Sequence, residues 1–141
     1  MSRATIRIAS ALLPTLMLVG CAPKYQRVSV ETWPAGAEVY LQRSGELSVA
    51  ASVAGFHGTL AASSFEEPFR SLGNAPVGYE FRIAEQEGLM AGGPAYGEVT
   101  RRYLEGRIRV VMSGYDPVER AVRFTGDPID LQVQLKPATS P

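Results

Sequence analysis

Polar and apolar residues alternate with a period of two through the last third of the chain, and this pattern limits the fold most strongly. The alternation occupies three runs, 108–112, 118–124 and 129–135. Turn-forming residues separate the runs at 113–117 and 125–128. Because successive side chains on a strand point to opposite faces, each run predicts a strand with one buried face. We therefore expect a three-stranded antiparallel meander here.

The same period appears earlier in the chain. Residues 28–32 and 39–41 alternate, and the Pro-Ala-Gly-Ala sequence at 34–37 lies between them. This arrangement predicts two strands paired like a hairpin. A further strand is expected at 78–84.

The remaining middle segments are less regular. Residues 47–62 are small and weakly apolar, and they are compatible with a strand, a short helix or a loop. Residues 85–97 contain four glycines and Pro94, which predicts an exposed loop. The whole pattern predicts an all-β fold, a small antiparallel β-sandwich of six to eight short strands with irregular insertions.

The first twenty residues have the composition of a bacterial export signal. Arg3 and Arg7 give a positively charged start, and residues 8–19 are apolar apart from a serine and a threonine, with Pro14 in their middle. A helix needs about 20 apolar residues to cross a bilayer, so this segment is too short to span one. We interpret residues 1–20 as a signal peptide.

The exit of this segment, Leu18-Val19-Gly20-Cys21, resembles the lipobox of bacterial lipoproteins. The resemblance implies cleavage before Cys21 and attachment of a diacylglycerol to its sulfur, with a third acyl chain in many bacteria. Two or three chains anchor a protein durably in a lipid bilayer, because each buried methylene contributes about 0.8 kcal/mol. Residues 21–25 then act as the acylated tether. By the same resemblance, Ala22 implies the outer membrane, facing the periplasm, with display on the cell surface left open.

The charge and the residue inventory exclude several classes of function. The chain has fourteen basic and fourteen acidic residues, and the mature chain without Arg3 and Arg7 has a net charge of −2. A nucleic-acid binder needs a basic face, so we expect no nucleic-acid partner. One cysteine and one histidine cannot form an intramolecular disulfide or a four-ligand zinc site. We expect no metal and no cofactor.

Several short motifs resemble the PEGA family of bacterial envelope domains. Val28-Ser29-Val30 followed by 34–41 resembles its start, and Gly73-Asn74-Ala75-Pro76 looks like a degraded Gly-x-Thr-Pro element. Residues 104–110, 114–118 and 131–137 are similar to its closing strands. The resemblance covers about 27–42 and 104–137 of a single domain at 26–137, and leaves two insertions at about 43–72 and 78–103 without a counterpart.

The PEGA resemblance implies a small β-sandwich that mediates binding or acts as a spacer, without enzyme activity. The motif residues also have mechanical roles in turns, and we interpret them as fold residues: Pro34, Gly36, Ala37, Gly114, Tyr115 and Pro117. The ring of Tyr115 is expected to pack inside, with its hydroxyl bonded to the backbone.

The residues that could carry catalysis do not form a recognised motif. His57 has serines near it in sequence, but no Gly-x-Ser-x-Gly elbow is present. Adjacent Glu66 and Glu67 would point to opposite faces of a strand, unlike the facing carboxylates of a glycosidase. Both pairs, Glu66 with Glu67 and Glu85 with Glu87, are interpreted as solvated surface residues. We expect no catalytic residues.

The aromatic residues give a second hypothesis. On the expected register Trp33 and Tyr40 point outward, and with Tyr96 they could stack on sugar rings. The leading hypothesis is an envelope lipoprotein that acts as a structural or protein-interaction module with a protein partner. The alternative is a lipoprotein that binds peptidoglycan or another polysaccharide through these aromatics.

Overall fold

The computed structural model describes residues 24–53, 56–90 and 95–139. Residues 1–23, which include the expected signal peptide and Cys21, lie outside these described residues. Within them the chain forms nine strands and no helix, so no helix long enough to cross a membrane occurs there. The strands are β1 (Tyr25–Trp33), β2 (Glu38–Val53), β3 (Phe56–Glu66), β4 (Arg70–Asn74), β5 (Val77–Arg82), β6 (Ala84–Met90), β7 (Ala95–Val111), β8 (Val118–Arg123) and β9 (Ile129–Gln134). The all-β prediction is confirmed, whereas the expected six to eight short strands are nine in the described residues, and β2 and β7 are long, with 16 and 17 residues.

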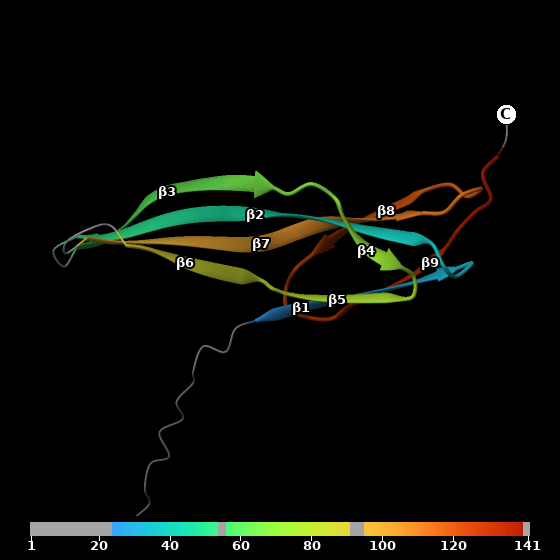
Figure 1. The fold of residues 1–141 in the computed structure, drawn as a ribbon, viewed down its shortest axis with the longest axis horizontal. Coiled ribbons are helices and arrows are strands. Elements are labelled where there is room, and N and C mark those ends of the chain that lie inside the picture. Colours follow the sequence, from blue (N-terminus) through green and yellow to red (C-terminus); the bar gives the residue numbers. More distant parts are fainter. Residues whose placement is uncertain (1–23, 54–55, 91–94, 140–141) are drawn as a thin grey trace, which may run out of the picture.

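The strands form two sheets. The small sheet has the order β5-β1-β9, with β1 antiparallel to β5 and parallel to β9. The large sheet has the order β3-β2-β7-β6, with β4 added beside β2 and β8 beside β7. The two sheets pack face to face over the right half of Figure 1, which is the sandwich that the sequence predicted.

The core lies between the two sheets and follows the period of two. From β1, the side chains of Gln26, Val28, Val30 and Thr32 are buried while their neighbours point outward or are only partly covered. The buried apolar residues that face them come mainly from the large sheet: Val39, Leu41, Tyr103, Ile108, Val110, Val122 and Phe124. Each fully buried aliphatic or aromatic side chain contributes about 1.5–3 kcal/mol to folding, so this core holds the two sheets together.

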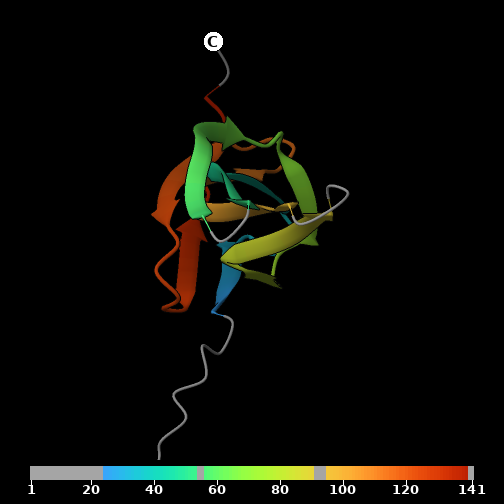
Figure 2. The ribbon, with the colours of Figure 1, turned by 90° about the vertical axis from the view of Figure 1, so that its left-hand side faces the viewer.

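The large sheet continues well beyond the small one. The first half of β2 pairs with β4 and its second half with β3, while β7 stays beside it throughout. In the same way, β7 pairs with β6 in its first half and with β8 in its second. We call the outer four-stranded part, residues 44–53, 56–66, 84–90 and 95–105, the extension; it forms the left half of Figure 1 and is curled in Figure 2.

Two glycines allow β2 and β7 to lie close together where the extension begins. A Cβ on Gly45 would overlap the backbone carbonyl of Arg102. A Cβ on Gly106 would overlap the carbonyl of Gln42 and lie 2.7 Å from the ring of Phe124. The register of the pair shifts at Ser44–Gly45, a β-bulge that adds twist at this point.

The two turns that carry the motifs resembling PEGA are bonded to each other. Gly36 has a φ of +98° and Gly73 a φ of +111°, a region that glycine enters without strain. The N–H of Gly36 donates to the carbonyl of Ala75 at 2.9 Å, and the N–H of Ala75 donates to the carbonyl of Ala37 at 2.8 Å. Each turn contains a cis peptide bond before proline. These two hydrogen bonds therefore join the turn between β1 and β2 to the turn between β4 and β5.

The structure corrects the expected strand pairing. The strands at 28–32 and 39–41 do not pair as a hairpin, because β1 and β2 lie in different sheets. The C-terminal meander is also wrong, because β8 pairs with β7 whereas β9 pairs with β1 in parallel. Alternation identifies the buried face of a strand, but it contains no information on which strand lies beside it.

The expected loop at 85–97 is also wrong. Residues Ala84–Met90 form β6, β7 begins at Ala95, and only 91–94 lie outside the described residues. Glycine costs little in the described part of this segment, because residues 84–88 are all exposed and little side-chain burial is lost. The segment 47–62, whose sequence is compatible with a strand, a short helix or a loop, is strand apart from the undescribed 54–55.

The turn after β7 agrees in part with its expected structure. Gly114 has a φ of +85°, and its carbonyl accepts a 2.9 Å hydrogen bond from Ala138. The ring of Tyr115 packs against the core as expected. Its hydroxyl makes no hydrogen bond to other described residues, so the expected backbone bond is not found. Pro117 is exposed and directly precedes β8.

Gln26 is a buried polar residue that fixes the turn between β8 and β9. Its Nε2 donates to the carbonyl of Asp127 at 2.6 Å, and its Oε1 accepts from the N–H of Gly126 at 3.0 Å. In the described part of the chain, every buried side-chain nitrogen or oxygen has a partner. The pairing of β1 with β9 begins at Val28 and Ile129. The Gln26 side chain therefore joins β1 to the turn that precedes β9.

We predict that Gln26→Leu lowers the free energy of unfolding by about 2–4 kcal/mol, because a carbonyl and an N–H lose their buried partner. Urea denaturation of the purified protein, followed by Trp33 fluorescence, measures the loss. Gln132→Leu is the control, since Gln132 is exposed on β9 and its loss should stay within about 0.5 kcal/mol. Equal losses for the two variants would contradict the role of Gln26.

Candidate functional site

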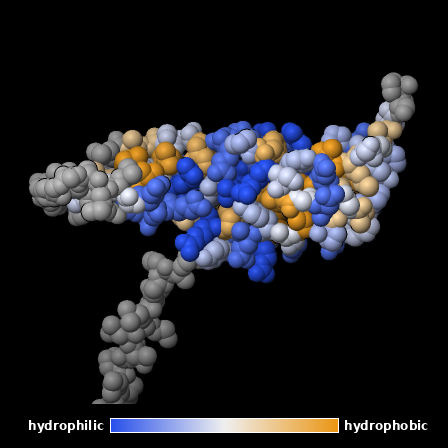
Figure 3. All heavy atoms as spheres, viewed as in Figure 1, coloured by the Kyte–Doolittle hydropathy of each residue, from blue (hydrophilic) through white to orange (hydrophobic). Residues whose placement is uncertain are grey.

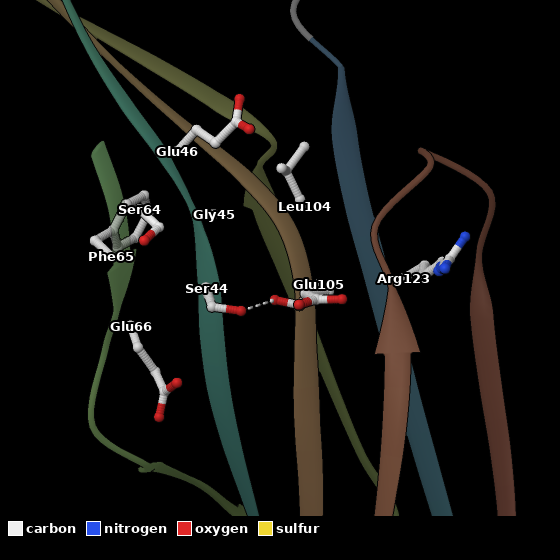
Figure 4. Close-up of a pocket in the computed structure, with 9 residues that line it drawn as sticks. All are labelled: Ser44, Gly45, Glu46, Ser64, Phe65, Glu66, Leu104, Glu105 and Arg123. Atoms are coloured by element: carbon white, nitrogen blue, oxygen red, sulfur yellow. Dashed lines mark hydrogen bonds between the residues drawn. The ribbon is translucent and has the colours of Figure 1, made fainter. Parts of the chain in front are cut away.

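A groove crosses the outer face of the large sheet where the extension meets the sandwich (Figure 4). It has a volume of about 640 Å³. Strands β2 and β7 form its floor, β3 forms one side and β8 the other. The residues that line it are Ser44, Gly45, Glu46, Ser64, Phe65, Glu66, Leu104, Glu105 and Arg123.

The groove is polar and mostly acidic. Glu46, Glu66 and Glu105 are exposed, and Arg123 is the single basic residue in its lining. The hydroxyl of Ser44 donates to the backbone carbonyl of Glu105 at 3.2 Å. These groups offer carboxylate acceptors to a cationic or N–H-rich ligand, with the 40% exposed Leu104 as an apolar contact.

A second hollow of about 380 Å³ continues this groove toward the sandwich. It shares Ser44, Glu66, Glu105 and Arg123 with the first and ends at Arg107. The Nε2 of Gln42 donates to Glu66 Oε1 at 2.7 Å within it. The two hollows together form an open channel along β2 and β7.

A buried ion pair lies below this groove. Arg43 is 7% exposed, and its guanidinium bonds to Glu67 Oε2 at 2.9 Å through both Nε and Nη2. The guanidinium carbon lies 4.1 Å from the ring centroid of Tyr103 and 5.0 Å from that of Phe81. Arg43 therefore contacts β7 of the large sheet and β5 of the small sheet at once.

Tyr103 completes this cluster. Its hydroxyl donates to Glu67 Oε1 at 3.1 Å, so both carboxylate oxygens of Glu67 are bonded. Burial raises the pKa of the Tyr103 phenol, while the Arg43 charge opposes that rise. The phenol thus stays protonated and acts as a donor. Phe65 and Phe81 pack edge-on against its ring.

The opposite face of the extension has a smaller hollow of about 270 Å³. Half-buried Leu47 and Val99 and exposed Arg101 lie beside Glu85 and Glu87, which are both exposed as predicted. Figure 3 shows hydrophobic surface both toward the outer end of the extension and over the sandwich. The hollow combines an apolar floor with an acidic rim.

The three aromatic residues of the glycan hypothesis do not form one surface. Trp33 is 46% exposed and points outward from the small sheet. Tyr40 is half-buried on the outer face of the large sheet, so both point away from the core as predicted but on opposite sides of the sandwich. The hydrogen bond to Glu38 raises the pKa of the Tyr40 phenol. The side chain of Tyr96 lies outside the described residues, and its backbone pairs with Ser52 in the extension.

The structure separates Glu66 and Glu67 as predicted. Glu66 is exposed in the groove as predicted. The prediction that Glu67 is a solvated surface residue is wrong, because its side chain turns to the inside and bonds to buried Arg43. The backbone of His57 pairs with Ser52, and its side chain lies outside the described residues. No group of three or more His, Cys, Asp or Glu side chains in the described ranges is close enough to hold a metal ion.

The interpretation of the sequence missed Arg43, although a signal was present. Val39 and Leu41 point into the core, and the period of two places residue 43 on the same face. A basic residue at an inward position needs a buried acid partner. Glu67 could not be identified as that partner, because 24 positions separate the two residues.

The chain has no match among protein-family models, curated proteins or solved structures.

We predict that Arg43→Ala lowers the free energy of unfolding by about 3–5 kcal/mol, because the half-buried Glu67 carboxylate loses its cation. Urea denaturation measures the loss. The control is Arg107→Ala, since that side chain is 63% exposed and lies 3.6 Å from Glu119. An exposed pair of this kind contributes about 1 kcal/mol or less. Similar losses in the two variants would contradict a structural role for the buried pair.

Proposed function

We propose that this chain is a non-catalytic envelope lipoprotein, anchored through acylated Cys21, whose extension binds a protein partner. The observation that carries the proposal is the shape of the large sheet. The stretches 43–72 and 78–103, which the PEGA resemblance leaves unmatched, contribute most of one continuous four-stranded extension beyond the sandwich. Structure added to a rigid domain is a common place for binding surfaces.

The edge strand β3 supports a protein partner in particular. It is 11 residues long, and the stretch 58–65 carries no charged residue and no proline. Soluble proteins usually protect such an edge with charges or proline, because its free backbone groups can pair with another chain. The opposite edge, β6, has Glu85 and Glu87. A partner strand can therefore add to β3, the mode known as β-augmentation.

The groove at the root of the extension runs beside this edge. Ser64, Phe65 and Glu66 belong both to β3 and to the groove lining. A strand added to β3 would pass near the exposed carboxylates there, so a partner segment with lysine or arginine at that point fits best. The glycan alternative has less support, because Trp33 and Tyr40 point to opposite sides of the sandwich.

We predict that Cys21→Ser releases the protein from the membrane fraction, because the thioether-linked acyl chains can no longer form. Fractionation of cells that express the full chain, followed by detection of the protein in the soluble and membrane pools, measures this. Ala22→Ser is the control and should leave the distribution unchanged. Unaltered membrane association of the Cys21→Ser variant would overturn the anchoring.

We predict that shortening the extension abolishes binding of the partner while the sandwich remains folded. Residues 47–63 and 85–101 are each replaced by Asn-Gly. Glu46 pairs with Ser64, and Ala84 pairs with Arg102, so a two-residue turn can close each hairpin. Crosslinking in cells, with identification of the adducts by mass spectrometry, should detect a protein with the full chain and lose it with the shortened one.

A second pair of variants tests the edge. Ala62→Lys with Ser64→Lys places charges on β3, and the matched control, Ala84→Lys with Gln86→Lys, places them on β6. The β3 pair should weaken crosslinking much more than the β6 pair. If the shortened chain folds and keeps every adduct, the extension is not the binding element.

A further inference from the structure

The outer face of the small sheet has two exposed aromatic residues on the strand that follows the proposed anchor. Three large hydrophobic residues are exposed in the described part of the chain, Tyr25, Trp33 and Leu104. Two of these, Tyr25 (43%) and Trp33 (46%), are the first and last residues of β1. Their even separation puts both side chains on the same face of the sheet, pointing away from the core.

The chain leaves little distance between this face and the bilayer. Tyr25 is four residues beyond Cys21, and four residues span at most about 14 Å. Strand β1 is the central strand of the small sheet, and β1 and β5 run along one long side of the molecule in Figure 1. The outer face of the large sheet is farther away by the thickness of the sandwich, about 10 Å between sheets plus side chains.

From these observations we infer that the outer face of the small sheet lies against the lipid headgroups of the membrane that holds Cys21. Tyr25 and Trp33 are the contacts at its two ends, about 26 Å apart along β1. Tyrosine and tryptophan suit this position, because an apolar ring with a polar tip is stable at the boundary between headgroups and acyl chains. This inference rests on the proposed acylation of Cys21.

The charges on this face fit a zwitterionic lipid surface. Arg27 pairs with Glu80 at 3.1 Å, and Arg82 lies over the Tyr25 ring, with its Nε 3.1 Å from the hydroxyl. Lys24 adds a cation at the anchored end. The acids on this face are Glu31, Glu80 and Asp130, equal in number to these three cations. Exposed Asp127 and Lys136, at the two ends of β9, add one charge of each sign. The face is therefore neutral, and the aromatic residues supply the attraction.

This orientation also determines what remains accessible. With the small sheet against the membrane, the groove and the outer face of the large sheet point away from the lipid. The extension then runs alongside the membrane rather than away from it, because β2 and β7 are continuous from the sandwich into the extension. The orientation leaves the groove open to a partner in the aqueous compartment.

The test uses Trp33, the only tryptophan, as its own reporter. The full chain is purified from membranes with its acyl groups and reconstituted into phosphatidylcholine vesicles brominated near the carbonyl end of one acyl chain. Bromine quenches tryptophan only at short range, so Trp33 should lose a large part of its emission relative to unbrominated vesicles. Its emission maximum should also shift to shorter wavelength on reconstitution.

Two variants in a Trp33→Phe background provide the matched comparison. Tyr25→Trp should be quenched like Trp33, whereas Tyr40→Trp, on the outer face of the large sheet, should keep its emission. Quenching of Tyr40→Trp in place of the other two would overturn the orientation, as would vesicle flotation of the protein without quenching at any position. Failure of the native chain to float with vesicles would instead overturn the anchor itself, and the orientation with it.

Discussion

The buried pair between Arg43 and Glu67 is the contact on which both parts of the molecule depend. Arg43 lies on β2 where the sandwich ends, and Glu67 follows β3 directly, with its N–H bonded to the Arg43 carbonyl at 2.8 Å. The guanidinium also contacts Phe81 of the small sheet and Tyr103 of β7. A buried ion pair adds little net stability over an apolar contact of equal size. Removal of one partner, however, strongly destabilises the fold, because the other charge stays buried without a partner. We infer that it specifies one register: a shift of β3 along β2 would leave both charges unpaired.

The extension forms because β2 and β7 each pair with one neighbouring strand in the sandwich and with a different one beyond it. Strands β2 and β7 have 16 and 17 residues, well beyond the common range of about 3–10. At Gly45 and Gly106 the two strands approach so closely that no side chain fits, and the bulge beside Gly45 adds twist. On one side of this crossing they bind β4 and β8, and on the other β3 and β6. The groove follows from this exchange, because its sides are β3 and β8.

The sequence predicted the strands better than their partners. The alternation at 28–32 and at 108–112 identified the buried faces correctly, because that pattern depends only on each strand and the solvent. The parallel pairing of β9 with β1 joins segments about 100 residues apart, and no local pattern encodes it. The segment 85–97 has the composition of a loop, and its described residues 85–88 are all exposed, so no buried face gives the alternation that indicates a strand. The period of two, continued from Val39 and Leu41, places Arg43 on the buried face. No local pattern identifies Glu67, 24 positions away, as its partner.

The asymmetry between the two edges of the extension has a physical consequence for any partner. Adding a strand to β3 satisfies free backbone groups that are otherwise solvated, so the net gain per hydrogen bond is modest, about 0.5–1.5 kcal/mol. Backbone pairing alone would therefore bind any extended chain, including a second copy of β3, whose stretch 58–65 carries no charge to oppose such pairing. Selectivity must come from side chains beside the edge. The described groups placed to supply it are Glu46, Glu66 and Glu105 in the groove, which favour a basic segment and disfavour an acidic one. Strand β3 itself contains no lysine or arginine, so a second copy of β3 would bring no such cation to Glu66. The groove therefore favours a different, basic chain over self-association.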